Sequence, residues 1–352
     1  MQGISDRLWR RRDLAAVSWD CGVHQEQVQR LNERATSADA PPGVFDNRIA
    51  VVVPCLNESA AIAKVVSDFR AALPTAEIYV FDNASTDDTG AVAEAAGAVV
   101  RREPRAGKGH VVRRMFADID ADIYVMVDGD DTYDASAAPK MVEMLVQERL
   151  DMVVGLRDDL SKETSRAGHE FGNILITGFL NRFFGARFGD TLSGYRAMSR
   201  RFVKTFPCLS DGFEIETEMA VHIVTLALPF GEVHTAYGAR PEGSASKLRT
   251  FRDGARILRT MVNLLRQEKP ALFFGAIGLA LATLALILAW PLGVTYWHTG
   301  LVPRIPTAVL CTGLMISALL TWCCGVILDS TARGRTETRR LAYLSWRAPE
   351  GR

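Results

Sequence analysis

The sequence predicts an α/β fold, a Rossmann-like domain with a mostly parallel sheet flanked by helices, followed by a C-terminal two-helix transmembrane hairpin. Two observations support this prediction. Between residues 48 and 245, short β-branched runs alternate with segments of helical periodicity, which is typical of a parallel sheet covered by helices. Beyond residue 270, two uncharged apolar runs follow, and each is long enough to cross the hydrocarbon core of a bilayer.

The 352-residue chain divides by composition into five segments. Residues 1–47 are polar and end in a Pro-Pro-Gly cluster that breaks regular structure, so we expect a loosely attached, partly disordered N-terminal extension. The other predicted segments are an α/β domain over 48–245, an amphipathic membrane-surface helix over 246–269, a two-span hairpin over 270–330 and a basic cytoplasmic tail over 331–352.

Five short runs rich in β-branched residues predict the strands of the sheet. The stretches between them are long enough for helices, as in Ser59 to Leu73, where apolar residues recur on one helical face. Ligands of such sheets bind beyond the carboxyl ends of the strands, so polar residues that follow a strand are candidates for a site. The predicted strands are Ile49–Val53, Glu77–Phe81, Ala98–Val100, Ile123–Val127 and Met152–Val154.

The predicted hairpin consists of residues 271–290 and 305–328, which contain no charged side chain. A pair of buried core helices is the alternative, but core helices of this length usually carry a polar face. Arg266 and Lys269 precede the first run and four arginines follow the second, whereas the connecting segment has only Arg304. The positive-inside rule therefore predicts a multi-pass protein of the cell inner membrane with its α/β domain and both termini cytoplasmic.

Residues 248–265 combine apolar side chains with four arginines, and Arg266 follows them just before the first span. This composition is typical of a helix that lies on an anionic membrane surface. A solvated basic helix is the alternative, and the position next to a span favours the membrane.

Charge and cysteine usage exclude several classes of protein. Lysine plus arginine and aspartate plus glutamate both total 41, which gives no support for a nucleic-acid partner. The six cysteines have neither zinc-site nor disulfide spacing, so we expect a reducing compartment. The basic cluster within residues 1–12 is not followed by an apolar run, so it is not expected to be a secretory signal.

An acidic turn follows the fourth predicted strand and is the strongest sign of a site. Asp128 and Asp130 flank Gly129, which permits a turn that can aim both carboxylates at one ion. A divalent cation held by one or two carboxylates and by substrate phosphates is the usual Mg²⁺ or Mn²⁺ arrangement. Solvated loop residues are the alternative for this motif taken alone.

Two further polar clusters follow the first and second predicted strands, at the same edge of the sheet. Turns that cap the next helices explain part of them. A carboxylate at the tip of the second strand can also accept hydrogen bonds from a nucleobase. The clusters contain Pro54, Asn57, Glu58, Asp82 and Asn83.

Together these elements resemble the family 2 glycosyltransferases, which have the nucleotide-binding GT-A fold; the resemblance covers about residues 48–245. Three motifs narrow it to the polyprenyl-phosphate sugar transferases of the dolichyl-phosphate mannose synthase kind. They are Arg105-Ala-Gly107-Lys108-Gly109, Leu192-Ser-Gly-Tyr-Arg196 and Tyr237-x-x-Arg240-x-x-Gly-Ser-x-Ser246-Lys247.

The resemblance assigns roles to individual residues. It implies an Mg²⁺ or Mn²⁺ ion on Asp128 and Asp130, and catalytic roles for Glu216, Asp130 and Arg240. The acceptor phosphate would contact Arg196, Arg240, Ser246 and Lys247, in keeping with the affinity of arginine for phosphate. Surface salt bridges are the alternative for any one of these. The nucleotide-sugar would be held by Pro54, Asn57, Glu58, Asp82, Asn83, Lys108, Asp128 and Arg196.

Two positions need comment. Relatives with an Asp-Ala-Asp-x-Gln motif offer a glutamine as a further metal ligand, but Thr132 stands at that place here and Asp131 precedes it. Glu216 lies in an acidic stretch that begins a helix, where the helix dipole alone could favour acids. The resemblance makes Glu216 the first choice for a catalytic or orienting carboxylate, with Glu214 in reserve.

The activity that the resemblance implies is inverting transfer of a sugar from a UDP- or GDP-linked donor to a polyprenyl phosphate at the cytoplasmic membrane face. Another lipid acceptor, such as a diacylglycerol or a glycolipid, is the alternative enzyme. A non-catalytic membrane scaffold is the alternative of a different class. The identity of the sugar and the oligomeric state, including a homo-oligomer, stay open.

Overall fold

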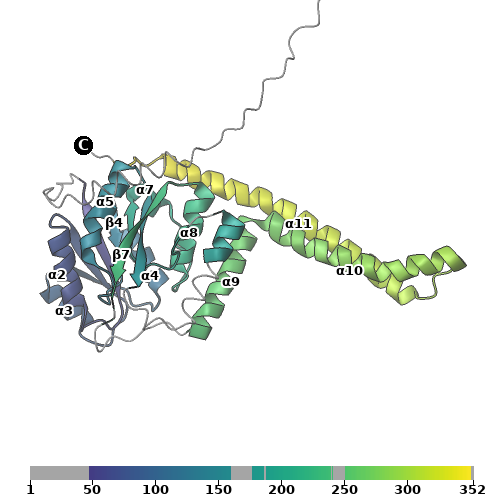
Figure 1. Cartoon of the computed structure of the whole chain (residues 1–352), viewed down its shortest axis with the longest axis horizontal. Helices are drawn as coiled ribbons and strands as arrows, with labels where there is room; N and C mark the ends of the chain where they lie inside the picture. The colour runs from purple at the N-terminus through teal and green to yellow at the C-terminus, as the bar shows by residue number, and fades with distance from the viewer. Residues whose placement is uncertain (1–46, 160–176, 186–187, 239, 241–249, 350–352) are drawn as a thin grey trace, which may run out of the picture. The chain divides into compact units, whose positions relative to one another are not determined.

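The structure is a computed structural model that describes residues 47–159, 177–185, 188–238, 240 and 250–349. Its centre is a seven-stranded sheet with the strand order β3-β2-β1-β4-β6-β5-β7 (Figure 1). The strands are β1 (Ile49–Cys55), β2 (Glu77–Asp82), β3 (Val99–Arg102), β4 (Ile123–Met126), β5 (Met152–Asp159), β6 (Arg196–Ser199) and β7 (Phe230–Tyr237).

Most strand pairs are parallel, as predicted. β1 pairs in parallel with β2 and β4, β2 with β3, and β5 with β7. Only β6 runs against its neighbours β4 and β5. The five predicted strands are all present, each ending within a few residues of its predicted end except β5, which is longer.

Two hydrophobic cores lie on opposite faces of the sheet because successive side chains of a strand point to opposite sides. In β1, Val51 and Val53 belong to one core, and Ala50 and Val52 belong to the other. The first core is covered by α2 (Ile62–Ala72), α3 (Thr89–Ala95), the 3₁₀ turn η1 (Ala135–Ala137) and α5 (Ala138–Gln147). The second is covered by α4 (Lys108–Asp118), helical residues 177–184, α7 (Arg200–Thr205) and α8 (Ile215–Leu226).

β6 and β7 were not predicted from the sequence. β6 has four residues and begins with an arginine, so it shows no apolar run. β7 is half-buried and carries Glu232 and His234 among its apolar residues, which weakens the strand pattern. Both strands gain their stability from pairing with β5, a long-range contact that local periodicity cannot reveal.

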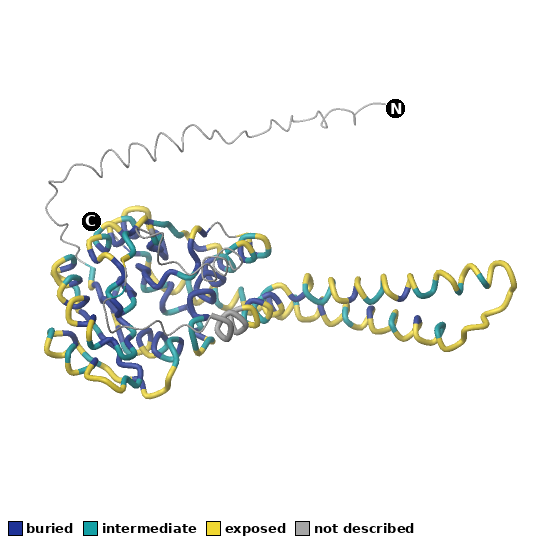
Figure 2. The backbone as a smooth tube through the Cα atoms, turned by 60° about the horizontal axis from the view of Figure 1, so that its bottom comes forward, coloured by how far each residue is buried: buried dark blue, intermediate teal, exposed yellow. Residues whose placement is uncertain are grey.

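Two long apolar helices follow the α/β domain. α10 (Pro270–Thr299) and α11 (Ile305–Leu344) contain the two predicted spans, and both are long and apolar enough to cross a membrane. They pack closely along their length, with Gly278 against the Ala318 carbonyl and Gly325 against Phe274. Most of their surface is exposed (Figure 2), in contrast to buried core helices.

Helix α11 continues well past the predicted end of the second span, so residues 331–344 form its last turns rather than a separate tail. These turns contact the α/β domain: Arg340 donates to the Leu226 carbonyl at 3.1 Å and Tyr343 donates to the Asp151 carboxylate at 2.8 Å. Arg339 forms an ion pair with Glu268 at 3.0 Å. The hairpin is therefore tied to the domain through polar contacts at its base.

Helix α9 (Thr250–Glu268) lies where the amphipathic membrane-surface helix was predicted. Met261 and Leu265 are buried in the second core, so this part of its apolar face packs on the domain and is not available to lipid. Leu258 and Val262 are exposed and leave a smaller apolar surface beside the base of the hairpin.

Candidate active site

The carboxyl ends of β1, β2 and β4 meet at one edge of the sheet, as expected for parallel strands. Cys55, the last residue of β1, lies opposite Asp82, the last residue of β2. A cavity of about 220 Å³ opens here. Its lining residues are Pro54, Cys55, Leu56, Glu58, Asn83, Gly107, Lys108, Val111, Asp128, Gly129, Asp130, Phe213 and Arg240.

The acidic turn brings Asp128 and Asp130 to this one cavity. Gly129 sits so close to the Cys55 sulfur that a Cβ atom would collide with it. Asp131 adopts a left-handed backbone conformation with φ of 57°, which redirects the chain after the turn. The predicted convergence of the two carboxylates therefore depends on a glycine and on a strained residue beside them.

Asp130 is held by an arginine that lies 110 positions later in the sequence. Arg240 donates from Nε and Nη2 to the same Oδ2 atom of Asp130, both at 2.7 Å. The other oxygen, Oδ1, accepts a hydrogen bond of 2.6 Å from the Thr132 hydroxyl. Thr132, the departure from the family's glutamine, thus orients the carboxylate. Burial alone would lower the pKa of Arg240, but the charge of Asp130 outweighs it and raises that pKa.

Asp128 belongs to a second charge cluster, in which Lys108 lies between two carboxylates. The Lys108 ammonium is 2.5 Å from Asp128 Oδ1 and 2.6 Å from Glu216 Oε1. Burial works against the charge, yet the two carboxylates raise the pKa of Lys108. The other oxygen of Glu216, Oε2, is buried without a hydrogen-bond partner. Burial raises the pKa of Glu216, and nearby Asp128 adds to this effect.

The predicted nucleotide residues form a hydrogen-bonded frame around the strand ends. The side-chain oxygen of Asn57 accepts from the Thr86 backbone amide at 2.7 Å, and the backbone amide of Asn57 donates to the Ser85 hydroxyl at 2.9 Å. Asp82 Oδ1 accepts from the Ser85 amide at 2.9 Å. Pro54, Glu58 and Asn83 line the cavity, whereas Asn57 and Asp82 are not among its lining residues.

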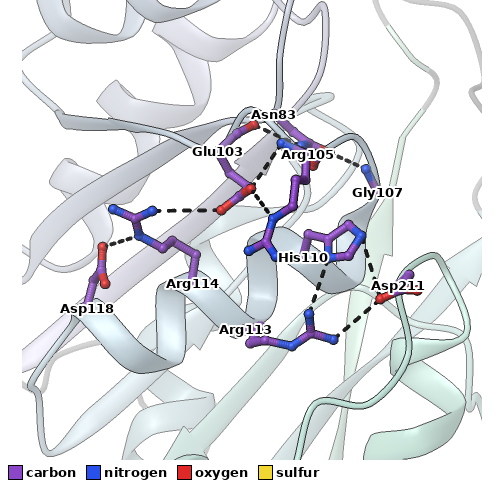
Figure 3. A network of polar contacts seen from close by, with 9 residues as sticks. All are labelled: Asn83, Glu103, Arg105, Gly107, His110, Arg113, Arg114, Asp118 and Asp211. Atoms are coloured by element: carbon purple, nitrogen blue, oxygen red, sulfur yellow. Dashed lines mark hydrogen bonds and ion pairs between the residues drawn. The ribbon is translucent and has the colours of Figure 1, made fainter.

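Asn83 connects this frame to the loop before α4. It donates to the Arg105 carbonyl at 2.6 Å and accepts from the Gly107 amide at 2.8 Å. The buried Glu103 accepts from both the amide and the side chain of Arg105 at 3.0 Å, as Figure 3 shows. These bonds fix the loop that delivers Lys108 to the cavity, although Glu103 carried no signal beyond its place after a strand.

A second loop, residues 208–213, closes over the start of α4. Arg113 donates to the Cys208 carbonyl at 2.9 and 2.7 Å, and Gly107 and Gly109 approach the backbone of residues 210 and 211 too closely for any Cβ atom. The loop thereby places Phe213 in the cavity wall, with the centre of its ring 5.9 Å from the Lys108 ammonium. A role for Phe213 was not predicted. The only hint in the sequence was the pair of glycines on either side of Lys108, which allow another backbone segment to approach closely.

Arg196 differs from its expected role as a phosphate ligand. Its side chain is only 1% exposed, and it donates to the carbonyls of Ser193 at 3.0 Å and Thr191 at 2.7 Å. Burial lowers the pKa of Arg196. The guanidinium stabilises the turn before β6, and in this conformation it is not among the residues that line the cavity. This turn also places Gly194 against the Asp128 carboxylate.

Two other predicted residues, Ser246 and Lys247, lie outside the described residues. Within the described part of the chain no group of three or more potential metal-ligating side chains occurs. Asp128 and Asp130 nevertheless fit a magnesium or manganese ion, because both carboxylates line one cavity and such ions take further oxygen ligands from phosphates and water. Each carboxylate is balanced by a cation, Lys108 or Arg240.

A mostly parallel sheet whose strand ends carry a turn of two carboxylates, with an arginine and a lysine facing them, is an arrangement suited to a phosphorylated ligand and a divalent cation. The chain belongs to glycosyl transferase family 2, whose sequence profile matches residues 50–206. It is 37% identical to glycosyltransferase AglJ of Haloferax volcanii over 243 residues, which covers 68% of this chain and 80% of that protein.

Other relatives agree with this membership. The chain is 30% identical to the dolichyl-phosphate hexose transferase of Haloferax volcanii over 227 residues, covering 64% of this chain and 96% of that protein. It also resembles crystal structures of glucosyl-3-phosphoglycerate synthase from Mycobacterium tuberculosis. One of these, with Mn²⁺, UDP and glucosyl-3-phosphoglycerate, has a TM-score of 0.51 at 24% identity and covers 63% of this chain and 79% of that one. The fold is therefore GT-A.

Proposed function

We propose that this glycosyltransferase moves a sugar from a UDP- or GDP-linked donor to a polyprenyl phosphate, with inversion at the anomeric carbon. The observation that carries the proposal is the single cavity in which Asp128 and Asp130 face Lys108 and Arg240. Such a cavity has carboxylates for a metal-bound diphosphate and a guanidinium for a second phosphate. The dolichyl-phosphate hexose transferase among its relatives supports a lipid-phosphate acceptor.

Asp128 and Asp130 would hold Mg²⁺ or Mn²⁺ in this proposal. When bound, the ion supplies positive charge at the departing nucleoside diphosphate. The Mn²⁺ and UDP bound to the mycobacterial glucosyl-3-phosphoglycerate synthase are in keeping with this arrangement. Thr132 and Arg240 keep the Asp130 carboxylate oriented by bonding one to each oxygen. Glu58 and Asn83 in the cavity wall, with Pro54, Asn57 and Asp82 around them, would hold the nucleotide.

The reaction needs no strong base. A phosphate monoester with a second pKa of about 6 is already largely ionised at neutral pH. Its oxygen forms the bond to the anomeric carbon while the bond from that carbon to the diphosphate breaks, and no proton has to move. Positioning and charge neutralisation would then supply most of the rate.

Arg240 is our choice for the residue that contacts the acceptor phosphate. Its side chain lines the cavity, and its Nε and Nη2 atoms bond to Asp130, so Nη1 is the donor that we assign to the acceptor phosphate. Ser246 and Lys247, which follow in the same motif, would join it. Glu216 does not line the cavity; it would act as a positioning residue that holds Lys108 against Asp128.

The membrane location is part of the proposal. We place the hairpin of α10 and α11 in the cell inner membrane, with the α/β domain and both termini on the cytoplasmic side. The basic residues at the base of the hairpin and the apolar surfaces of both helices support this orientation. A polyprenyl phosphate in that membrane would present its headgroup on the side where the domain lies.

The test is sugar transfer by the purified full-length protein to undecaprenyl phosphate, with a panel of nucleotide-sugars, Mg²⁺ or Mn²⁺ and mass analysis of the lipid. We expect Arg240→Ala to lose about a hundredfold or more in kcat/KM. Arg101→Ala, at an exposed ion pair on β3, is the matched control and should keep its activity. Full activity of Arg240→Ala would instead favour an acceptor such as a diacylglycerol or a glycolipid.

The non-catalytic scaffold is separated by calorimetry. The proposal requires that UDP or GDP bind with measurable heat in the presence of Mg²⁺ or Mn²⁺, and that Asp130→Asn weaken this binding. Absence of heat with both nucleotides would favour the scaffold, because a scaffold does not need the carboxylate cavity.

A further inference from the structure

A second cavity lies at the base of the hairpin, where α9 passes into α10 and α11 leaves its apolar run. It has a volume of about 250 Å³ and shares no residue with the lining of the catalytic cavity. Its lining combines polar and charged groups with apolar side chains. The lining residues are Arg266, Gln267, Pro270, Phe274, Leu328, Thr331 and Arg335.

Two of the lining residues, Arg266 and Arg335, are positively charged. Arg335 donates to the Gln267 carbonyl at 2.5 Å, which helps to hold its guanidinium beside the cavity. Among the described residues, no acid lies within ion-pair distance of Arg266 or Arg335. Their neighbours behave differently, because Arg333 is paired with Asp329 and Arg339 with Glu268. The cavity is thus a local concentration of unpaired positive charge.

We propose that this cavity binds the phosphodiester headgroup of an anionic phospholipid. The phosphate would lie between Arg266 and Arg335, since arginine binds phosphate oxygens through several N–H donors. Phe274 and Leu328 belong to the apolar stretches of α10 and α11, so an acyl chain that leaves the headgroup meets apolar side chains. Basic pockets between spans at the cytoplasmic side suit this class of ligand.

The geometry favours a lipid over a free anion and over the acceptor. The apolar side chains of Phe274 and Leu328 do not add to the binding affinity of a free phosphate ion, whereas they can contact an acyl chain. The acceptor phosphate has to reach the cavity that contains Asp130, and the lining residues of the two cavities do not overlap. This inference rests on the proposed insertion of the hairpin into the membrane, but it does not depend on the sugar or on the acceptor.

The experiment measures phospholipid binding to the detergent-purified full-length protein by native mass spectrometry. The probes are phosphatidylglycerol and, for comparison, phosphatidylcholine. We expect Arg266→Ala to weaken phosphatidylglycerol binding about fivefold and the double variant R266A/R335A about thirtyfold, because each arginine near a membrane surface contributes similarly. The charge-matched control R259A/R333A changes the same two helices outside the cavity and should stay within about threefold of the original protein.

Three outcomes of the binding measurement would overturn the inference. They are unchanged phosphatidylglycerol binding by R266A/R335A, equal binding of phosphatidylcholine, and displacement of the lipid by excess inorganic phosphate, which would indicate a free-anion site. Vesicle flotation and sugar transfer are measured on the same samples. Loss of phosphatidylglycerol binding with transfer intact supports the cavity independently of the catalytic proposal. Failure of the unmodified protein to float removes the membrane location, and this inference with it.

Discussion

Two carboxylate clusters lie at opposite ends of the strands of the same sheet. The Asp151 cluster is at the amino ends and the Asp128 cluster is at the carboxyl ends, and the two are built differently. Asp151 precedes β5 and is fully buried; it accepts two bonds from Arg201 and one each from Ser199 and Tyr343. At the carboxyl ends Asp128 is 31% exposed to the cavity. One oxygen of Glu216 there is buried without a partner.

From this difference we expect the Asp151 cluster to stabilise the fold and the carboxylates at the cavity to serve a ligand. Asp151 lies outside the catalytic cavity, and both of its oxygens accept hydrogen bonds within the chain, so it is placed to stabilise the fold. Asp130 also has both oxygens bonded, but it lines the cavity together with Asp128. Glu216 beside them keeps one oxygen unpartnered, and charged groups arranged in this way are typical of functional sites. We therefore expect the same residue type to have different roles at the two ends of the strands, so that substitutions separate stability from activity.

The largest effect is expected at Asp151. Asp151→Ala leaves the partly buried guanidinium of Arg201 without its carboxylate and removes the acceptor of the buried Ser199 hydroxyl, so we expect a loss of about 3 kcal/mol in the free energy of unfolding. The measurement is denaturant unfolding followed by fluorescence, with kcat/KM corrected for the folded fraction and expected to be unchanged. Asp158→Ala, at an exposed pair with His234, is the control and should change little. A stable Asp151→Ala protein would break the comparison.

Asp130 should show the reverse pattern. Asp130→Asn keeps the shape of the side chain but removes the charge proposed to bind the metal, so we expect kcat/KM to fall about 10²- to 10³-fold. Its free energy of unfolding should change by no more than about 1 kcal/mol, because the amide oxygen can still accept from Arg240. Asp131→Asn, one residue away and paired with Lys64 outside the cavity, serves as the control. Equal losses in both variants would argue against a specific role for Asp130.

The sequence contained much of this arrangement. The strand runs, the acidic turn and the motif around Lys108 predicted which residues share an edge of the sheet, because the carboxyl ends of parallel strands meet there. The family's sequence profile and its structural relatives confirm the fold. Asp128, Asp130, Lys108 and Arg240 line one cavity.

What could not be predicted depends on contacts far apart in the chain. The burial of Arg196 follows from its place at the start of β6 between β4 and β5, and no local pattern shows that pairing. The Asp151 cluster joins residues 48 to 192 positions apart, so neither its composition nor its spacing was visible. Glu103 and Phe213 act through loops whose course is set by close packing of glycines.

His222 provides a polar group that belongs to neither cluster. It lies on α8 with both ring nitrogens buried and unpartnered, packed against Phe202 and Phe206. Burial, together with the charge of Arg339, lowers the pKa of His222 to about 3. The unfolded chain binds the proton near pH 6.5, so between about pH 6.5 and pH 3 unfolding takes up a proton and stability falls as the pH falls.

His222→Phe should remove this pH dependence. At pH 5 the unmodified protein loses about 2 kcal/mol relative to pH 7.5 through this residue, and the variant should not. Thermal unfolding at the two pH values measures the difference. His234→Phe removes an exposed histidine instead and is the matched control. If His222→Phe and the unmodified protein lose stability in parallel on acidification, the ring is not held neutral and buried in solution.

The smallest effect is expected at Tyr343, in the last turns of α11, where a substitution tests whether these turns belong to the Asp151 cluster. Tyr343→Phe removes the hydroxyl that donates to Asp151 but keeps the ring 4.8 Å from the Arg201 guanidinium, so only one hydrogen bond is lost. We expect a loss of about 1 kcal/mol in the free energy of unfolding. In the Asp151→Ala background the same change should have almost no effect, because the acceptor is gone. An undiminished effect there would mean that Tyr343 stabilises the protein through its ring, and that the hairpin is joined to the domain by packing rather than by the buried carboxylate.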